Sequence, residues 1–370
     1  MKYVYFIIIS LVVCGCQNRQ IDTNTFSSID TIVYHGAVDT LCSQYVSEIT
    51  YLPLMNSDKH ILKDVTKIRT DNKRIYIFSK RMRRLSVYEK NGSFAYELNQ
   101  LGKGHKEYME TANFTLDDKY IYILDNVKND VVLFNSQTGA FVKKIKIPFI
   151  AWDMEYLWNG RFLFTCLPNN PNGKISHKQP DGAVWETDSS LNKVQRQYFP
   201  YQDEYYEMVG KDTYFTKSEG KVIFQSYQNQ GFYIFEKGKD DPVYIDMAFD
   251  KPLPAKGKID YAQANENGYQ FLTETPFVLN SYIMLTIADN GYDELVLYNR
   301  NTGQISKNQE FESYNTILFP LSIIDNKFVC YLADYDFYEM LVSSGFKRAN
   351  TEIEKLLANG GACLLFYDME

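Results

Sequence analysis

The sequence concentrates positive charge in one short segment, SKRMRR at residues 79–84. Arginine and lysine side chains this close together could clamp a carboxylate or a phosphate, because a guanidinium group binds such anions through two parallel hydrogen bonds. The alternative is a solvated loop between two strands. Arg81, Arg83 and Arg84 are therefore candidate ligand-binding residues.

A second candidate segment reads LGKGHKEY at residues 101–108. Its Gly-Lys-Gly motif is similar to loops that cradle phosphate, but such loops open a helix, and no helical pattern follows here. We expect the glycines to serve a turn that needs positive φ. His105, Glu107 and Tyr108 are candidate ligand-binding residues, although Glu107 and Tyr108 could instead hold the loop in shape.

Aromatic residues are unusually frequent, with 30 Tyr, 24 Phe and 3 Trp making 15% of the chain. Exposed tyrosines supply flat, amphipathic contact area for sugars or peptides, whereas others only pack loops down. The candidates in loops are Tyr205, Tyr206, Tyr292 and Tyr335. Asp293 joins them, because it lies in a segment that resembles a calcium loop but lacks the bidentate Glu, so we expect a turn there.

Other kinds of chemistry find little support in the sequence. The four histidines, at positions 35, 60, 105 and 177, have no HxH or HxxxH spacing, and no GxSxG motif occurs. We therefore expect no metal and no cofactor, name no catalytic residue and leave enzymatic activity open. The 39 Lys and Arg against 46 Asp and Glu give a net charge of −7, which argues against nucleic acid as a partner.

The first fifteen residues have the pattern of a signal peptide. A lysine at position 2 precedes an apolar run over residues 3–13, which is too short to span a bilayer. The run ends in Val13-Cys14-Gly15-Cys16, which resembles the lipobox of bacterial lipoproteins. We expect Cys16 to carry lipid; an ordinary cleaved signal or an uncleaved anchor is the alternative. Residues 16–40 would then be the lipidated cysteine and a polar tether to the membrane.

Four further cysteines remain: Cys42, Cys166, Cys330 and Cys363. An oxidising compartment permits disulfides between them, with three possible connectivities. Cys330 and Cys363 lie in apolar, strand-like runs, where a free cysteine commonly acts as a small buried hydrophobe. A structural disulfide and buried thiols both stay open.

Short apolar runs rich in β-branched and aromatic residues recur along the chain and predict strands. IYIF at 75–78 is followed by LSVY at 85–88, and IYIL at 121–124 is followed by VVLF at 131–134 with the same offset. Such self-similarity indicates a repeat architecture. Four more pairs extend it to six units: RFLF with VWET, KVIF with FYIF, YIML with LVLY, and KFVC with CLLF.

Six such units predict an all-β, six-bladed β-propeller with four-stranded antiparallel blades. Each unit has faces that it cannot cover alone, and radial closure removes the open edges of a stack. VSEITYLPL at 46–54 and CLLFYDM at 363–369 should complete the last blade. We expect one propeller domain over residues 41–370, with a small helical insertion near residues 335–358.

These segments resemble a family, the bacterial six-bladed β-propeller lipoproteins related to NHL and TolB-like propellers. The shared features are ITYLPL, the strands IYIF and IYILD, and a GxGxxEY segment that ends here at Tyr108. His105-Lys106 stands where the family usually has Pro-Gly, and Asn359-Gly360-Gly361 replaces its Asn-Pro. The resemblance implies the propeller fold and an envelope location, and it implies no established reaction.

The loops divide between the two faces of such a propeller. With strands a to d running from axis to rim, the b–c turns and the d–a connections share one face. Long segments fall there, and we expect those at 101–110, 198–212, 249–270 and 333–361 to surround one mouth of the channel. Long loops on a rigid scaffold are where binding residues concentrate.

Three functions are compatible with this pattern. The first is an outer-membrane lipoprotein of the bacterial cell envelope, facing periplasm or cell surface, that binds a glycan, peptide or protein partner through its loop-rich face. The second is a metal-assisted hydrolase or lyase, lactonase-like, with its site at the channel mouth. The third is a structural or assembly lipoprotein. The sequence favours the first.

Overall fold

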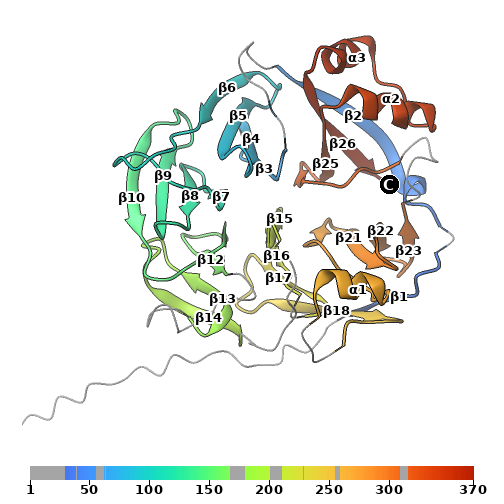
Figure 1. Ribbon diagram of the computed structural model, residues 1–370, viewed down its shortest axis with the longest axis horizontal. Helices are drawn as coiled ribbons and strands as arrows, with labels where there is room; N and C mark the ends of the chain where they lie inside the picture. The colour runs from blue at the N-terminus through green and yellow to red at the C-terminus, as the bar shows by residue number, and fades with distance from the viewer. Residues whose placement is uncertain are drawn as a thin grey trace, which may run out of the picture.

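The computed structural model describes residues 30–38, 40–55, 62, 64–166, 180–200, 211–227, 229–254, 259–308 and 316–370. Within these ranges the strands form six sheets, which stand as blades around a central axis (Figure 1). The innermost strands of different blades contact one another around that axis. The predicted all-β, six-bladed propeller is confirmed.

Blades 1 to 3 are each built from four consecutive antiparallel strands, ordered from axis to rim. Blade 1 contains β3 (Lys67–Thr70), β4 (Arg74–Ser79), β5 (Arg84–Glu89) and β6 (Phe94–Leu98). Blade 2 contains β7 (Asn113–Leu116), β8 (Tyr120–Asp125), β9 (Asp130–Asn135) and β10 (Phe141–Lys146). Blade 3 contains β11 (Asp153–Tyr156), β12 (Phe162–Thr165), β13 (Gly182–Thr187) and β14 (Val194–Pro200).

Blades 4 to 6 depart from that plan. Blade 4 contains β15 (Phe215–Ser218), β16 (Lys221–Phe224), β17 (Phe232–Glu236) and β18 (Val243–Phe249), with β1 (Asp30–Tyr34) added outside. In blade 5 two short inner strands, β19 (Phe271–Leu272) and β20 (Phe277–Val278), both pair with β21 (Tyr282–Asp289), followed by β22 (Tyr292–Asn299) and β23 (Ile305–Lys307). Blade 6 contains β24 (Ser322–Ile324), β25 (Lys327–Leu332), β26 (Ala362–Met369) and β2 (Val46–Leu54).

The first two blades repeat the same a–b turn. The Asp71 carboxylate accepts the backbone N–H of Arg74 at 2.7 Å and the Tyr76 hydroxyl at 2.7 Å. In blade 2 the Asp117 carboxylate accepts the equivalent hydrogen bonds from the Tyr120 N–H and the Tyr122 hydroxyl, both at 2.7 Å. Aspartate side chains favour such turns because they bond the backbone two or three residues on. The repeated sequence therefore encodes a repeated structure.

The hydrophobic core lies between neighbouring blades. One cluster joins Tyr76 and Phe78 of blade 1 to Phe114 and Ile121 of blade 2, all with almost no exposure. The described cysteines are buried within this core as free thiols. Burial raises the pKa of Cys42 to about 12, so its thiol is unreactive in the folded protein.

The two ends of the propeller meet in blade 6, as the sequence predicts. β2 pairs antiparallel with β26, from Val46 opposite Met369 to Leu54 opposite Ala362. Figure 1 shows this as the blue N-terminal strand against the red C-terminal one. The C-terminal end of β2 packs against Gly92 of blade 1. Gly92 has φ +83°, and a Cβ at this position would come within 2.0 Å of the Pro53 carbonyl oxygen. Only glycine fits that junction without displacement of the backbone.

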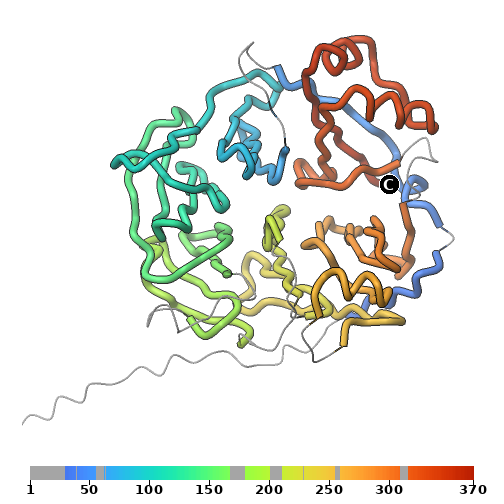
Figure 2. The backbone as a smooth tube through the Cα atoms, in the orientation of Figure 1, coloured from blue at the N-terminus to red at the C-terminus, as the bar shows by residue number. Residues whose placement is uncertain are grey.

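The prediction of a polar tether over residues 16–40 is wrong for residues 30–34, which form β1. This strand pairs in parallel with β18, and it buries Ile32 and Tyr34. The alternation of apolar residues in DTIVY places these two side chains on one face of a strand. Figure 2 shows the blue segment following the outside of blades 4 and 5 to reach blade 6. Cys16 and the predicted signal peptide lie outside the described residues.

Three α-helices occur in the described ranges: α1 (Tyr261–Glu266), α2 (Tyr335–Ser343) and α3 (Thr351–Ala358), besides a 3-10 helix at Cys42–Tyr45. The predicted helical insertion is confirmed by α2 and α3, which separate β25 from β26. The sequence analysis missed α1, although Asp260 and Gln263 form its capping box. None of the described helices has the length and apolar character needed to cross a membrane.

Candidate functional site

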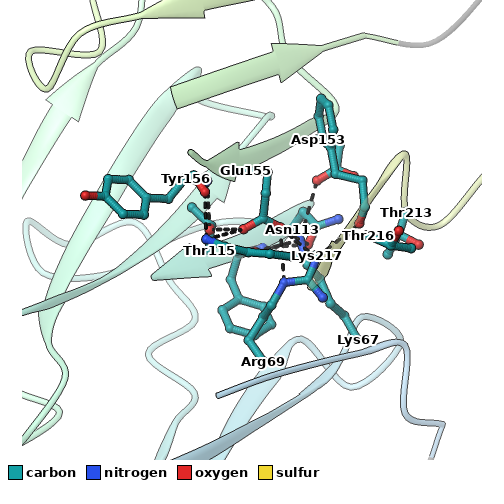
Figure 3. Close-up of polar contacts among 12 residues, drawn as sticks. Lys67, Arg69, Asn113, Thr115, Asp153, Glu155, Tyr156, Thr213, Thr216 and Lys217 are labelled. Atoms are coloured by element: carbon teal, nitrogen blue, oxygen red, sulfur yellow. Dashed lines mark hydrogen bonds and ion pairs between the residues drawn. The ribbon is translucent and has the colours of Figure 1, made fainter. Parts of the chain in front are cut away.

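Three inner strands bring charged side chains to the propeller axis. β3 supplies Lys67 and Arg69, β11 supplies Asp153 and Glu155, and β15 supplies Lys217. Residues two apart in a strand face the same side, so each pair points in one direction. Figure 3 shows the three cations converging on Glu155.

Glu155 is the centre of this cluster and has no solvent exposure. Its Oε2 accepts Nη2 of Arg69 at 2.7 Å and lies 3.1 Å from Nζ of Lys67. Its Oε1 accepts the Thr115 hydroxyl at 2.5 Å and lies 3.7 Å from Nζ of Lys217. Burial opposes ionisation of Glu155, but the three cations outweigh burial and hold its pKa well below the ordinary value. Burial lowers the pKa of Lys217 to about 8, against the attraction of Glu155.

Asp153 extends the cluster to blade 4. Its carboxylate accepts the backbone N–H of Tyr214 at 2.7 Å and lies 3.9 Å from Nζ of Lys67. Burial raises the pKa of Asp153, although Lys67 and the backbone N–H of Tyr214 oppose the shift. Lys67 also donates to Asn113 of blade 2 at 3.0 Å. The cluster therefore joins the inner strands of blades 1 to 4, and its charges are used within the protein.

A cavity of about 1040 Å³ lies beside this cluster on the axis. Its described lining comes from the inner strands, the b–c turns, the ends of the d–a connections and, in blade 5, from β21 and β22; it includes no residue of an a–b or c–d turn. The cavity therefore opens on the face where the sequence predicts the longer loops. Its charged lining residues are Asp64, Lys67, Arg69, Lys80, Arg81, Arg83, Glu110, Asp212, Glu274 and Asp293.

Blade 1 supplies all five cations of this lining, and each faces a carboxylate. Arg69 and Lys67 pair with Glu155, as described above. The other three pairs are Arg81–Asp64 at 3.6 Å, Arg83–Glu110 at 3.4 Å and Lys80–Asp212 at 3.0 Å. The Lys80 ammonium also lies 5.1 Å from the centre of the Trp152 ring, which suits a cation–π contact.

Blade 5 supplies the two remaining carboxylates, Glu274 and Asp293. Neither has a hydrogen bond or an ion pair with any residue that the structure describes. Desolvation raises the pKa of Glu274; Lys211 opposes this shift, and the negative charges of Asp212 and Asp293 add to it. No group of three or more His, Cys, Asp or Glu among the described residues is arranged to hold a metal ion.

Three of the predicted ligand-binding residues line the cavity: Arg81, Arg83 and Asp293. Arg81 and Arg83 belong to the β4–β5 turn, and Asp293 follows the β21–β22 turn. The basic segment predicted as a candidate anion clamp thus reaches the channel mouth, but its charges are paired with carboxylates.

The other predicted residues lie elsewhere. Arg84 pairs with Glu97 at 3.4 Å, and Tyr108 is buried between blades 1 and 2. Glu107 holds its own loop: its carboxylate accepts the Gly104 N–H at 2.8 Å and fills the space beside Gly102. His105 packs against Phe141 of blade 2, Tyr292 is 75% exposed outside the lining, and Tyr335 begins α2. Tyr205 and Tyr206 lie outside the described residues.

Several lining residues were missed by the sequence analysis, notably Trp152, Asp212, Glu274 and Phe319. They share one position: each stands one to three residues before an inner strand, namely β11, β15, β20 and β24. For Trp152, Asp212 and Phe319 this is the end of a d–a connection, so the residues before strand a were the available signal; Glu274 lies between β19 and β20 of the interrupted inner strand of blade 5.

The prediction that four long loops surround one mouth is only partly right. The segments 101–110 and 198–212 reach the cavity through Glu110 and Asp212. The segment 333–361 instead forms α2 and α3 on the outer side of blade 6, where α3 packs against β26 and β2, and α2 packs against α3 (Figure 1). No described residue of 249–270 lines the cavity, because α1 packs beside Phe271 and Ala288 of blade 5.

Six four-stranded blades around a cavity on the axis define the class of this protein as a six-bladed β-propeller. The chain belongs to the family described as Domain of unknown function (DUF4934), whose pattern matches residues 28–360. No curated protein sequence matches the chain. The relation to NHL and TolB-like propellers stays a prediction.

Among solved structures, the chain is similar to that of a Bacteroides fragilis protein named for its assumed export. That similarity has a TM-score of 0.75 at 19% identity and covers 92% of this chain and 99% of the other. A DUF4221 family member from Bacteroides vulgatus matches with a TM-score of 0.48 at 8% identity, covering 88% and 97%. Virginiamycin B lyase from Staphylococcus aureus matches with a TM-score of 0.38 at 14% identity, covering 76% and 78%. The similarity to the Bacteroides fragilis protein supports the propeller fold. The other two similarities have TM-scores below 0.5 and are too weak to support it.

Proposed function

We propose that this protein is a lipoprotein of the bacterial cell envelope that binds a polar ligand with flat apolar faces, such as a glycan or a peptide, in the cavity at its channel mouth. The observation that carries this proposal is the cavity itself. Its volume, about 1040 Å³, is at the upper end of the range for small-ligand pockets, and its walls mix charged groups with aromatic rings.

The chain path suits attachment to a membrane. β1 runs parallel to β18, so Asp30 lies opposite Ile245 near the start of that strand, and Tyr34 lies opposite Phe249 at its end. Strand d starts at the face of the a–b and c–d turns, so the chain enters β1 on the face opposite the cavity. A lipid on Cys16 would therefore leave the cavity open to solvent and to a partner. The similarity to a Bacteroides protein named for export agrees with this location.

Arg81→Ala and Phe319→Ala are each expected to weaken ligand binding by about 1–2 kcal/mol, because Arg81 can donate hydrogen bonds to the carbonyl or hydroxyl oxygens of a peptide or glycan, and Phe319 offers an aromatic face. The Arg81 side chain is 82% exposed and Phe319 is 43% exposed, so neither change should lower the melting temperature much. Glycan and peptide arrays probed with the wild type and the variants measure the effect.

Tyr108→Ala is the contrasting variant in the same experiment. Tyr108 is fully buried, so its loss should destabilise the protein by about 3–5 kcal/mol, the range for a deleted core aromatic. If the two cavity variants retain every array signal of the wild type, the ligand does not bind in this cavity and the proposal fails.

Cys16→Ser is expected to release the protein from membranes, because acyl chains on Cys16 would be its anchor. Cys14→Ser, two residues away, is the matched control and should stay with the membrane fraction. Fractionation of cells that express each variant, followed by metabolic labelling with a fatty acid, makes the comparison. A Cys16→Ser protein that is processed and sediments like the wild type would show that Cys16 is not the anchor.

A further inference from the structure

We propose that the blade 5 side of the cavity binds an organic cation, an ammonium or guanidinium group on an apolar stem such as a lysine or arginine side chain of a peptide. This inference rests on the proposed function, since it specifies the ligand of the same cavity. It favours a basic peptide over a neutral glycan.

The first observation is the distribution of paired and unpaired charge. The cations that line the cavity all come from blade 1, and each has a carboxylate within 4 Å. Glu274 and Asp293 have no such partner among the described residues. The carboxylates without an ion pair therefore lie on blade 5, and both side chains are exposed.

The second observation is the environment of Lys211, the cation that acts on Glu274. It is 4% exposed, its ammonium donates to Oε1 of Gln225, and it lies 4.8 Å from the centre of the Tyr227 ring. Burial lowers the pKa of Lys211, against the attraction of Glu274. The Lys211 ammonium makes its hydrogen bond to Gln225 and forms no ion pair with Glu274, while Asp212 and Asp293 repel a negative charge on Glu274. A ligand cation would relieve that repulsion.

The third observation is the apolar surface of the same cavity. Phe277 and Met284 of blade 5 and Phe319 at the entry to blade 6 line the same cavity, and Phe319 is 43% exposed. Aromatic faces attract cations and accept hydrocarbon stems. The carboxylates are not arranged as a metal site within the described residues, so the chemistry fits an organic cation.

Three probes of nearly equal shape and different charge test this inference: benzamidine, which is cationic, benzamide, which is neutral, and benzoate, which is anionic. Their dissociation constants are measured by calorimetric titration of the full chain. Benzamidine should bind at least about tenfold more tightly than benzamide, which corresponds to about 1.4 kcal/mol. In the double variant Glu274→Gln with Asp293→Asn, that preference should fall to about twofold or less.

Glu219→Gln is the matched control, because Glu219 is exposed in the β15–β16 turn on the opposite face; its preference should equal that of the wild type. Melting temperatures check that all variants fold. A preference that persists in the double variant overturns the inference, and so does the absence of binding by all three probes. If the three probes bind equally and Phe319→Ala weakens all of them, the cation preference is wrong while the proposed ligand cavity stands.

Discussion

A chain that lacks residues 362–370 is expected to lose cooperative folding altogether. These residues form β26, which is hydrogen-bonded to β25 on one side and to β2 on the other. Without β26, blade 6 loses the backbone hydrogen bonds to β25 and to β2, and β2 has no strand with which to pair. Unpaired strand edges of this kind promote aggregation.

β26 also joins two blades through its alternating side chains. Cys363, Leu365 and Tyr367 pack in the cluster that reaches blade 5, and Ala362 and Leu364 pack in the cluster that reaches blade 1. Truncation of a single buried Leu costs about 2–5 kcal/mol, and a whole domain is stable by only about 5–15 kcal/mol. The loss of all five side chains should therefore exceed the free energy of unfolding of the protein.

Removal of residues 1–34 is the matched control, because it also deletes one terminal strand, β1 at the N-terminal end. β1 is a fifth strand outside a blade that is already complete, so this protein should still unfold cooperatively, at a lower temperature. Circular dichroism during heating and in urea compares the two deletions with the wild type. A protein without β26 that melts cooperatively within a few degrees of the wild type would refute closure as the basis of stability.

The fold could be predicted from the sequence because the same pattern of strands and turns recurs along the chain. Pairs such as IYIF with LSVY become the two central strands of a blade, where buried β-branched and aromatic residues are needed on both faces. The turns at Asp71 and Asp117 repeat because they are stabilised within a few residues. β1 escaped the sequence analysis because its partner, β18, lies more than 200 residues away and DTIVY has no unit of its own.

The cavity was harder to predict because its contacts are long-range. Lys80 pairs with Asp212, 132 positions along the chain, and neither sequence segment indicates the other. Glu274 reaches the axis because the inner strand of blade 5 is interrupted between β19 and β20, where Pro276 has no N–H to donate. That interruption is a departure from the repeat, and a repeat pattern predicts only what its units share.

Glu155→Gln is expected to destabilise the protein by about 3–5 kcal/mol at neutral pH, the range for a buried ion pair that loses one partner. The variant keeps the size of the side chain but leaves Lys67, Arg69 and Lys217 around an uncharged amide. Urea unfolding at several pH values measures the difference. Glu186→Gln is the matched control on the same blade; its partner Arg161 is 28% exposed, so water replaces part of the lost interaction and the cost should be smaller.

The pH dependence separates the charge of Glu155 from its packing. The pKa of Glu155 is depressed in the folded protein, so its ionisation contributes stability above the ordinary Glu pKa of about 4.3, and that stability is lost as pH falls. The wild type and Glu155→Gln should therefore converge in stability as the pH is lowered below about 4. Lys217 has its effect at alkaline pH. Its pKa of about 8 in the folded protein lies below the ordinary Lys pKa of about 10.4, so the unfolded chain binds the proton more tightly. The free energy of unfolding should therefore rise between about pH 8 and 10.4. A gap between the two proteins that stays constant down to acid pH would mean that Glu155 acts through its shape and not through its charge.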